Sequence, residues 1–542
     1  MQSLDKFCDE LNGVYSQHGV GGVSEIVKKL SDLPDDASKY LNVAAIFLLD
    51  KGEQQEAITI FETALSLPSP DPLIYLNVAR FHVTEGQYFK AKRRLSEYET
   101  SGASTESELY LELAYLVSSN IGQSIKARAY AEELFSTQES HKGYLHNLMR
   151  SYIAIANARG VIDLFERYCE VTDLTIDEQI LVSTALWQLG DKKQSVEFLQ
   201  QTTTGDLAAQ ERRFIALFER FKHLKSQKQI VEYACNALLL RPSPQNLERF
   251  AQVLFNSGSY QAAMQCLDGA INTNHGTIEI SHIGIRATSQ NSILLRILIL
   301  LKTNPAEAYQ SLQRLMTTDD GYHTDIAVAA LGDFMCHLKL GASPSSFCPK
   351  PIDQVAIYER WVEKTKIDLD HLWQELSTLN FEYEPLGKTT SFGSQTKAVA
   401  FQIDTPQLAL LKEEIERAVY LYRENLPRKY YIYSRFPDLF DIFAWAVKVD
   451  ANGFQDFHIH SNAWVSGVLY FDTMAESEGG EINFLNAFDG FEDDILIEKC
   501  HRPSSGDLVL FPSSTFHSTN PNNSNKTRRC LAFDIKPVKA ES

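Results

Sequence analysis

The feature that most constrains the fold of this chain is an internal sequence repeat in its first hundred residues. A run of small and large residues recurs after 34 positions in the same order, with Ala45, Gly52, Ala57 and Phe61 echoed by Ala79, Gly86, Ala91 and Leu95. A period of this length is typical of stacked helix pairs. Small residues let two antiparallel helices approach closely, and a glycine suits the left-handed position at a helix end. The sequence therefore predicts a solenoid of antiparallel helices.

The repeated pattern resembles the tetratricopeptide repeat, and a late copy indicates that it extends far along the chain. Residues 254–263 repeat the same kind of pattern of small and large residues, Leu-Phe-Asn-Ser-Gly-Ser-Tyr-Gln-Ala-Ala. We assign residues 1–345 to this helical repeat domain. Such solenoids leave a long concave wall free, so the resemblance implies a protein or peptide partner. The alternative is that the repeats are a scaffold or a dimerisation surface for the other end of the chain.

The character of the sequence changes after the repeats. Residues 346–379 are polar and helical in pattern, and we expect them to connect two domains. We expect a loop at 387–396, an amphipathic helix from Pro406, and an apolar strand at 442–449. Helices that flank short strands suit a double-stranded β-helix, or jelly roll, which encloses a small-molecule site in its mouth. We assign residues 380–542 to this second domain.

Two histidines lie two residues apart in the strand that we expect over residues 455–470. Side chains on a strand alternate between its faces, so His458 and His460 should point to the same side and can hold one metal ion. His517 follows just past the apolar strand 508–511 and can complete the set. Three protein ligands on one face of Fe(II) leave open positions for a chelating keto acid and for dioxygen.

An arginine pair comes shortly after the third histidine. A planar guanidinium holds a carboxylate by two charge-assisted hydrogen bonds, for which it is better suited than an ammonium group. Arg528 or Arg529 can therefore hold the far carboxylate of such a keto acid. Because side chains alternate along a strand, only one of the two faces inward.

Residues 385–537 resemble the superfamily of 2-oxoglutarate- and Fe(II)-dependent oxygenases, within it a branch of largely unassigned substrate. The resemblance is carried by Thr389-Thr390, Gly393-Ser394-Gln395-Thr396, the ten residues from Gly453 to Asn462, Ser466 to Tyr470, Phe511-Pro512 with His517, and Arg528 with Ala532-Phe533. It implies Fe(II) and 2-oxoglutarate as cofactors, with ascorbate as a candidate stimulant. It also implies roles for five residues: His458, His460 and His517 as metal ligands, Arg528 as the clamp on the distal carboxylate, and Tyr470 as a hydrogen-bond donor to the same carboxylate.

The second histidine departs from the usual pattern of the superfamily. Most members have His-x-Asp or His-x-Glu where this chain has His460. An imidazole there leaves bound Fe(II) one unit more positive than a carboxylate does, which should change its redox poise and anion affinity. Two interpretations stay open. His460 binds the metal, or His458 and His517 hold it with water or Asn462 in the remaining place; the pair can also serve another metal.

Composition limits the partners and the compartment. The net charge of −19 argues against a nucleic-acid-binding surface, since phosphate binding needs a basic face. The eight cysteines show no Cys-x-x-Cys pairing, so neither a disulfide framework nor a thiolate zinc site is indicated. Nowhere is there an apolar run long enough to span a bilayer. We expect a cytoplasmic protein with neither nucleic acid nor membrane as a partner.

The sequence thus predicts an Fe(II)- and 2-oxoglutarate-dependent dioxygenase, a hydroxylase that forms succinate and carbon dioxide and acts on a protein or peptide recruited by the repeats. The first alternative is a non-catalytic scaffold with a degenerate metal-binding barrel. The missing carboxylate ligand supports this alternative, whereas Arg528 and Tyr470 oppose it. The second is a zinc hydrolase, which lacks an obvious general base and leaves Arg528 unexplained.

Overall fold

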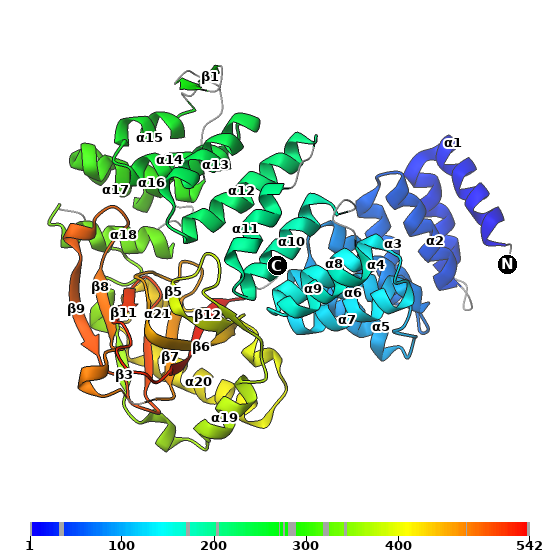
Figure 1. Ribbon diagram of the computed structural model, residues 1–542. Coiled ribbons are helices and arrows are strands. Elements are labelled where there is room, and N and C mark those ends of the chain that lie inside the picture. The colour runs from blue at the N-terminus through cyan, green and yellow to red at the C-terminus, as the bar shows by residue number, and fades with distance from the viewer. Residues whose placement is uncertain are drawn as a thin grey trace. The chain divides into compact units, whose positions relative to one another are not determined.

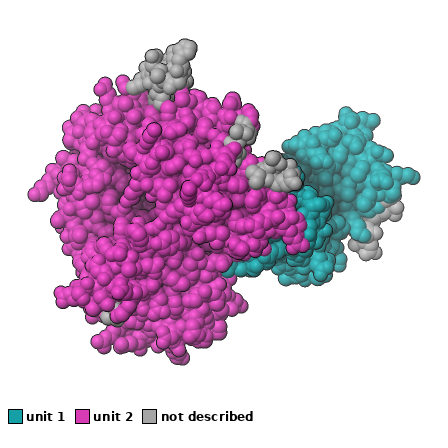
Figure 2. Space-filling view, viewed as in Figure 1, with its two compact units in different colours: residues 1–151, 541 teal, residues 152–540, 542 magenta. Residues whose placement is uncertain are grey.

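Antiparallel helices build the first part of the chain, as the repeat pattern predicts (Figure 1). The computed structural model describes residues 3–31, 37–169, 174–201, 205–269, 272–274, 277–279, 289–317, 325–340, 344–472 and 474–538. By packing, the chain divides into two compact units, residues 1–151 and 152–540 (Figure 2).

The first unit is a stack of helices. They are α1 (Leu4–Ser31), α2 (Ala37–Asp50), α3 (Gln54–Leu65), α4 (Pro72–Thr84), α5 (Tyr88–Thr100), α6 (Glu108–Asn120), α7 (Ser124–Thr137) and the start of α8 (Lys142–Ala154). The repeated glycines follow α2 and α4 with φ of 85° at Gly52 and 71° at Gly86, which only glycine adopts without strain. The repeated alanines are fully buried between paired helices: Ala45, Ala57, Ala79 and Ala91. The predicted helical repeats are confirmed.

Helices of the same kind open the second unit. They are α9 (Ala158–Tyr168), α10 (Ile176–Gln188), α11 (Lys192–Gln201), α12 (Leu207–His223), α13 (Gln227–Leu240), α14 (Pro244–Asn256), α15 (Tyr260–Leu267), α16 (Gln290–Thr303), α17 (Pro305–Thr317) and α18 (Ile326–His337), with a short hairpin of β1 (Asn272–Asn274) and β2 (Thr277–Glu279) after α15. Among the described helices, none has the length together with the apolar character that crossing a bilayer requires.

Two antiparallel sheets follow the helices. The larger has the order β3 (Ala356–Tyr358), β10 (Leu508–Pro512), β7 (Val465–Tyr470), β12 (Arg528–Pro537), β6 (Phe440–Gln455), β5 (Thr390–Thr396) and β4 (Phe381–Tyr383). The smaller has the order β11 (Phe516–Thr519), β8 (Ile482–Asn486) and β9 (Leu496–His501). Strands distant in sequence are neighbours in both sheets, which is the jelly-roll topology that the sequence predicts.

The large sheet is buried on both faces. Val465, Leu469 and Phe533 belong to one face, which packs against α19 (Leu369–Leu376) and α20 (Pro406–Asn425). The other face packs against the small sheet and contributes Val447 and Val509 to the interior of the barrel. Side chains on one strand alternate between these two cores, as the pleat requires.

Two expectations about local structure were wrong. The expected loop at 387–396 contains β5, a strand of polar residues that gives no apolar alternation and is held by its pairing with β6. The stretch 346–379 is helical only in α19 and in single turns at 351–354 and 361–364, and it also supplies the edge strand β3, which pairs with β10. The predicted domain limits themselves stay a prediction.

The last helices and the barrel share their apolar cores. Phe488 and Phe491, from the segment between β8 and β9, pack their rings 5.3 and 5.4 Å from that of Phe334 on α18. Lys302 on α16 places its ammonium 3.7 Å from the centre of the Phe491 ring. Figure 1 shows α18 beside the ends of β8 and β9. Helices of the repeat type therefore form part of the wall that supports the barrel.

Candidate metal centre

The three predicted metal ligands meet on neighbouring segments of the barrel. His517 lies on β11, and His458 and His460 lie in the segment that joins β6 to β7. We expected both of the latter on a regular strand, which was wrong. Only His458 pairs: its backbone N–H and C=O exchange hydrogen bonds of 3.1 Å with those of His517, as an isolated bridge. That bridge brings the first and third histidines together.

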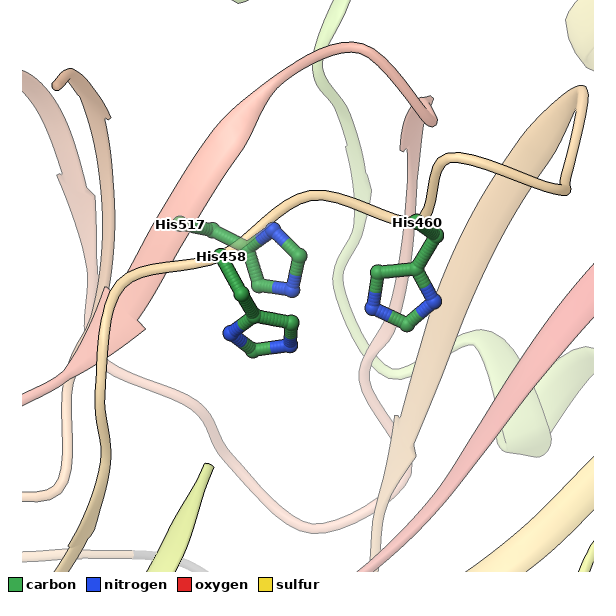
Figure 3. A group of neighbouring side chains, drawn as sticks. All are labelled: His458, His460 and His517. Atoms are coloured by element: carbon green, nitrogen blue, oxygen red, sulfur yellow. The ribbon is translucent and has the colours of Figure 1, made fainter. Parts of the chain in front are cut away.

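The imidazole rings surround one small space (Figure 3). Each histidine offers one ring nitrogen, and these three atoms lie within 4.8 Å of one another. The ring centres of His458 and His517 are 4.3 Å apart, and that of His460 is 5.1 and 5.2 Å from them. Among the described residues, these three histidines are the group of side chains that lie close enough together to hold a metal ion. Asn462 also lines the cavity, but it is exposed and does not belong to the cluster.

A hydrogen-bond acceptor faces Nδ1 of each ring. The Nδ1 atom of His458 lies 2.8 Å from the carbonyl oxygen of Asp456, and that of His517 lies 3.1 Å from the carbonyl oxygen of Thr515. The Nδ1 atom of His460 lies 2.6 Å from Oδ1 of Asp534. These acceptors place the proton on Nδ1 and leave the lone pair of Nε2 for a metal, as in most histidine metal sites.

Burial keeps two of the rings neutral. It lowers the pKa of His458 to about 3, an effect that the neighbouring His460 reinforces. Burial also lowers the pKa of His517 well below its ordinary value, and the other two histidines act in the same direction. A neutral imidazole is the form that binds metal. The donor set therefore fits a divalent transition metal, for which three imidazoles are suitable ligands.

A cavity of about 480 Å³ opens beside the histidines, and Arg528 lies in its wall. Arg528 is only 1% exposed. Its Nη1 donates to the carbonyl oxygen of Gly480 at 3.1 Å, whereas its Nε has no hydrogen-bond partner in the described part of the chain. An incompletely paired, buried guanidinium is costly, and an anion in the cavity would satisfy it.

Tyr470 lines the same cavity from β7 and is buried. Burial raises the pKa of its phenol, and the charge and hydrogen bond of Arg528 oppose that rise only in part. Its hydroxyl is therefore protonated at neutral pH and can donate a hydrogen bond. Arg528 and Tyr470 thus present donors to one region of the cavity.

Arg529 faces the opposite side of the sheet. Its Nε and Nη2 bind the carboxylate of Asp472 at 3.0 and 2.7 Å, and its guanidinium lies 5.1 Å from the ring centre of Trp373. The alternation of β12 therefore turns Arg528 toward the cavity and Arg529 away from it. The role of Arg528 as a clamp stays a prediction.

Sequence reasoning missed Asp534 and Lys388, which both line the cavity. The signal for Asp534 was present, because Cys530, Ala532 and Asp534 follow Arg528 at intervals of two and share its face of β12. Lys388 lies in the turn between β4 and β5, in the stretch that we expected to be a loop, and sequence alone did not place it beside the histidines.

The turn that carries Lys388 is fastened to the repeat helices. Nε1 of Trp187 on α10 donates to the carbonyl oxygen of Glu384 at 3.3 Å, and Lys192 on α11 forms an ion pair with the Glu384 carboxylate. The other oxygen of that carboxylate, Oε1, accepts a hydrogen bond from the backbone N–H of Phe392 at 2.8 Å. Helices of the repeat type therefore fix one wall of the metal cavity.

Comparison with known proteins gives one family. Residues 443–534, which include all three histidines and Arg528, match the family model described as "Putative 2OG-Fe(II) oxygenase". The predicted family resemblance of the C-terminal domain is confirmed. No curated protein matches the chain.

Several solved structures resemble parts of the chain. A prolyl-4-hydroxylase of Pseudomonas putida is 14% identical over 34% of this chain and 93% of its own, with a TM-score of 0.26. A structure of HygX from Streptomyces hygroscopicus with nickel, 2-oxoglutarate and hygromycin B bound is 11% identical over 34% of this chain and 84% of its own, with a TM-score of 0.25. A tetratricopeptide repeat protein of Parabacteroides merdae is 15% identical over 52% of this chain and 94% of its own, with a TM-score of 0.31.

Proposed function

We propose that the chain is a 2-oxoglutarate- and Fe(II)-dependent dioxygenase that hydroxylates a polypeptide, and the match of residues 443–534 to the family model supports this proposal. One observation carries the proposal. Three imidazoles, each with an acceptor already at its Nδ1 atom, converge beside a buried arginine whose Nε lacks a partner among the described residues. A site that held only a structural metal would have no use for that arginine.

Each residue of the site has a distinct task in this proposal. His458, His460 and His517 hold Fe(II), and Arg528 and Tyr470 bind the distal carboxylate of 2-oxoglutarate. Bound together, Fe(II) and 2-oxoglutarate supply the oxidising chemistry, in which dioxygen and the keto acid yield succinate, carbon dioxide and a hydroxylated product. Ile482 and Phe511 give the cavity one apolar wall, which would limit access of water to the reaction.

A groove on the repeat helices supports a polypeptide as the substrate. It has a volume of about 440 Å³ and is lined by Ile180 of α10, Ile215 of α12, and Leu386 and Gly387 of the turn between β4 and β5. Gly387 also lines the metal cavity. An extended segment lying on α10 and α12 would therefore reach the cavity by crossing this turn.

Anaerobic titration with Fe(II) and 2-oxoglutarate tests the site. The chelate of a keto acid on Fe(II) has a weak visible charge-transfer band, which we expect in the wild type and in Arg529→Ala. We expect the band to be lost in His517→Ala and strongly weakened in Arg528→Ala. Arg529 is the matched control, because it is adjacent in sequence but pairs with Asp472 on the other face.

The alternative is a non-catalytic scaffold, which the absence of a carboxylate among the three clustered ligands favours. It predicts no charge-transfer band in any of these proteins. A wild type without the band, under conditions where it binds Fe(II), would therefore overturn the oxygenase and leave the scaffold.

A further inference from the structure

No carboxylate is among the three clustered histidines, but the carboxylate of Asp534 lies directly behind one of them, His460. Asp534 lies on β12 and is 7% exposed, and its Oδ1 accepts a hydrogen bond from Nδ1 of His460 at 2.6 Å. The same oxygen accepts from Oγ of Ser466 at 2.8 Å, and Ser466 in turn contacts Oγ of Ser513 at 2.8 Å. Asp534 is therefore fixed behind His460.

Among the described residues, neither His458 nor His517 has a carboxylate at its Nδ1 atom. Nδ1 of His458 and Nδ1 of His517 face backbone carbonyl oxygens, which carry only a partial charge. Within the described site, the full negative charge stands behind His460 alone. This is the position at which most of the superfamily has a carboxylate ligand.

We propose that Asp534 is a positioning residue that supplies the metal, through the ring of His460, with the negative charge that a ligating carboxylate would give directly. The proposal rests on the proposed function of this site. The hydrogen bond from Nδ1 fixes the tautomer of His460 and makes its Nε2 a more basic ligand. Burial strengthens the effect, because little water screens the charge of Asp534.

The ring of His460 is also held on its face. Trp445 of β6 lies nearly parallel to it, with ring centres 5.8 Å apart and an angle of 21° between the planes. A carboxylate behind the ring and an indole beside it restrict the orientation of His460, whose ring points toward the other two histidines (Figure 3).

Metal affinity tests the proposal without turnover. We expect Asp534→Asn, which keeps the size of the side chain and an acceptor oxygen, to bind Co(II) about 10–100-fold more weakly than the wild type. We also expect its Co(II) absorption spectrum to change. Asp472→Asn is the matched control, since Asp472 pairs with Arg529 on the outer face, and it should bind Co(II) as the wild type does. An unchanged affinity and spectrum in Asp534→Asn would overturn the proposal.

A second pair of variants separates action through His460 from a general effect on folding. In the background His460→Gln, Asp534→Asn should cost little further affinity, because the link to the metal is already broken. If Asp534→Asn weakens Co(II) binding equally in both backgrounds, Asp534 does not act through His460 and the proposal fails. Circular dichroism of each variant shows that it is folded.

The two proposals fail in different experiments. Co(II) titration without the keto acid reports only on Asp534 and the histidines, whereas the charge-transfer band reports on 2-oxoglutarate. A protein that shows the Asp534 effect but no band keeps the positioning role and loses the oxygenase function.

Discussion

Burial sets the charge of single residues in this site, and it does so before any metal arrives. His458 and His517 are neutral in the folded chain because protonation would place positive charge in a poorly solvated space that already holds a third imidazole. The folded protein thus keeps two of the proposed ligands in the form that binds metal, at the cost of stability in acid.

This cost predicts how the stability of the metal-free protein depends on pH. The pKa of His458 is about 3 in the folded chain, against an ordinary value of 6.5. Between these values the unfolded chain binds more protons, so the free energy of unfolding should fall as the pH falls through this window. Urea unfolding at several pH values measures it. His517→Gln removes one of the buried histidines, so its free energy of unfolding should depend less steeply on pH. An equally steep pH dependence would show that the buried histidines are not the cause.

At this scale, sequence reasoning grouped the three histidines correctly, although His458 and His460 do not lie on the expected strand. The histidine cluster and the inward direction of Arg528 were both predictable. Asp534 was not named, because its importance depends on a 2.6 Å contact with His460 across 74 residues of sequence. No short motif records such a contact.

At the scale of elements, the strands are set so closely that one methyl group matters. Gly467 on β7 lies between β10 and β12. A Cβ atom there would lie 2.3 Å from Cζ of Phe533 and 2.7 Å from Cδ2 of Leu510. Both side chains are fully buried, so a shift of either one would disturb its packed neighbours.

We therefore expect Gly467→Ala to lower the free energy of unfolding by about 1–3 kcal/mol. Gly332→Ala on α18 is the control, since its new Cβ would meet nothing closer than 3.7 Å and alanine favours a helix. Chemical denaturation of both variants measures the difference. A loss of stability in Gly332→Ala as large as that in Gly467→Ala would show that the cause is not the close packing of β7.

The turn between β4 and β5 gives a second prediction for an element. In Lys192→Glu the new carboxylate would repel Glu384 and loosen the turn that carries Lys388. The affinity for 2-oxoglutarate and the rate of its turnover should each fall severalfold. Lys193→Glu is the control, because Lys193 is 86% exposed and pairs only weakly with Glu197. Titration and turnover of both variants measure the effect. Equal behaviour of the two variants would mean that α11 does not position the turn.

Which strands could be predicted depended on how much apolar sequence they carry. The apolar strand β10 was expected where it occurs, whereas β6 runs past the expected end at Val449 to Gln455 and β7 occupies only the last part of the expected strand 455–470. The strands β3 and β5 were not expected, because they are short or polar and exist through pairing with β10 and β6. The segment of the two histidines was expected as a strand, yet it is held at a single bridge to β11.

At the scale of the whole molecule, the helices after residue 151 and the barrel form one compact unit. Phe491 is 5% exposed because α16 and α18 cover it, and Ile326 and Ala329 of α18 complete the core on the outer face of the large sheet. The barrel on its own would expose these surfaces. Repeats of similar sequence therefore belong to two different units, which periodicity cannot reveal.

This division predicts the behaviour of shortened chains. A chain that begins at residue 155, after α8, should fold and bind Co(II) as the full chain does. A chain that begins at residue 346 should lose stability, since uncovering Phe491 alone costs roughly 1.5–3 kcal/mol. Thermal unfolding and Co(II) titration compare the three. A stable, metal-binding chain of residues 346–542 would show that the helices are dispensable for the barrel.

The conversion of 2-oxoglutarate to succinate tests the central claim most directly. With Fe(II) and dioxygen, we expect the wild type to form succinate, slowly even without its substrate, and Arg529→Ala to do the same. His517→Ala and Arg528→Ala should form none above the background of free Fe(II). No succinate from a wild type that binds Fe(II), or an equal rate in all four proteins, would contradict the account.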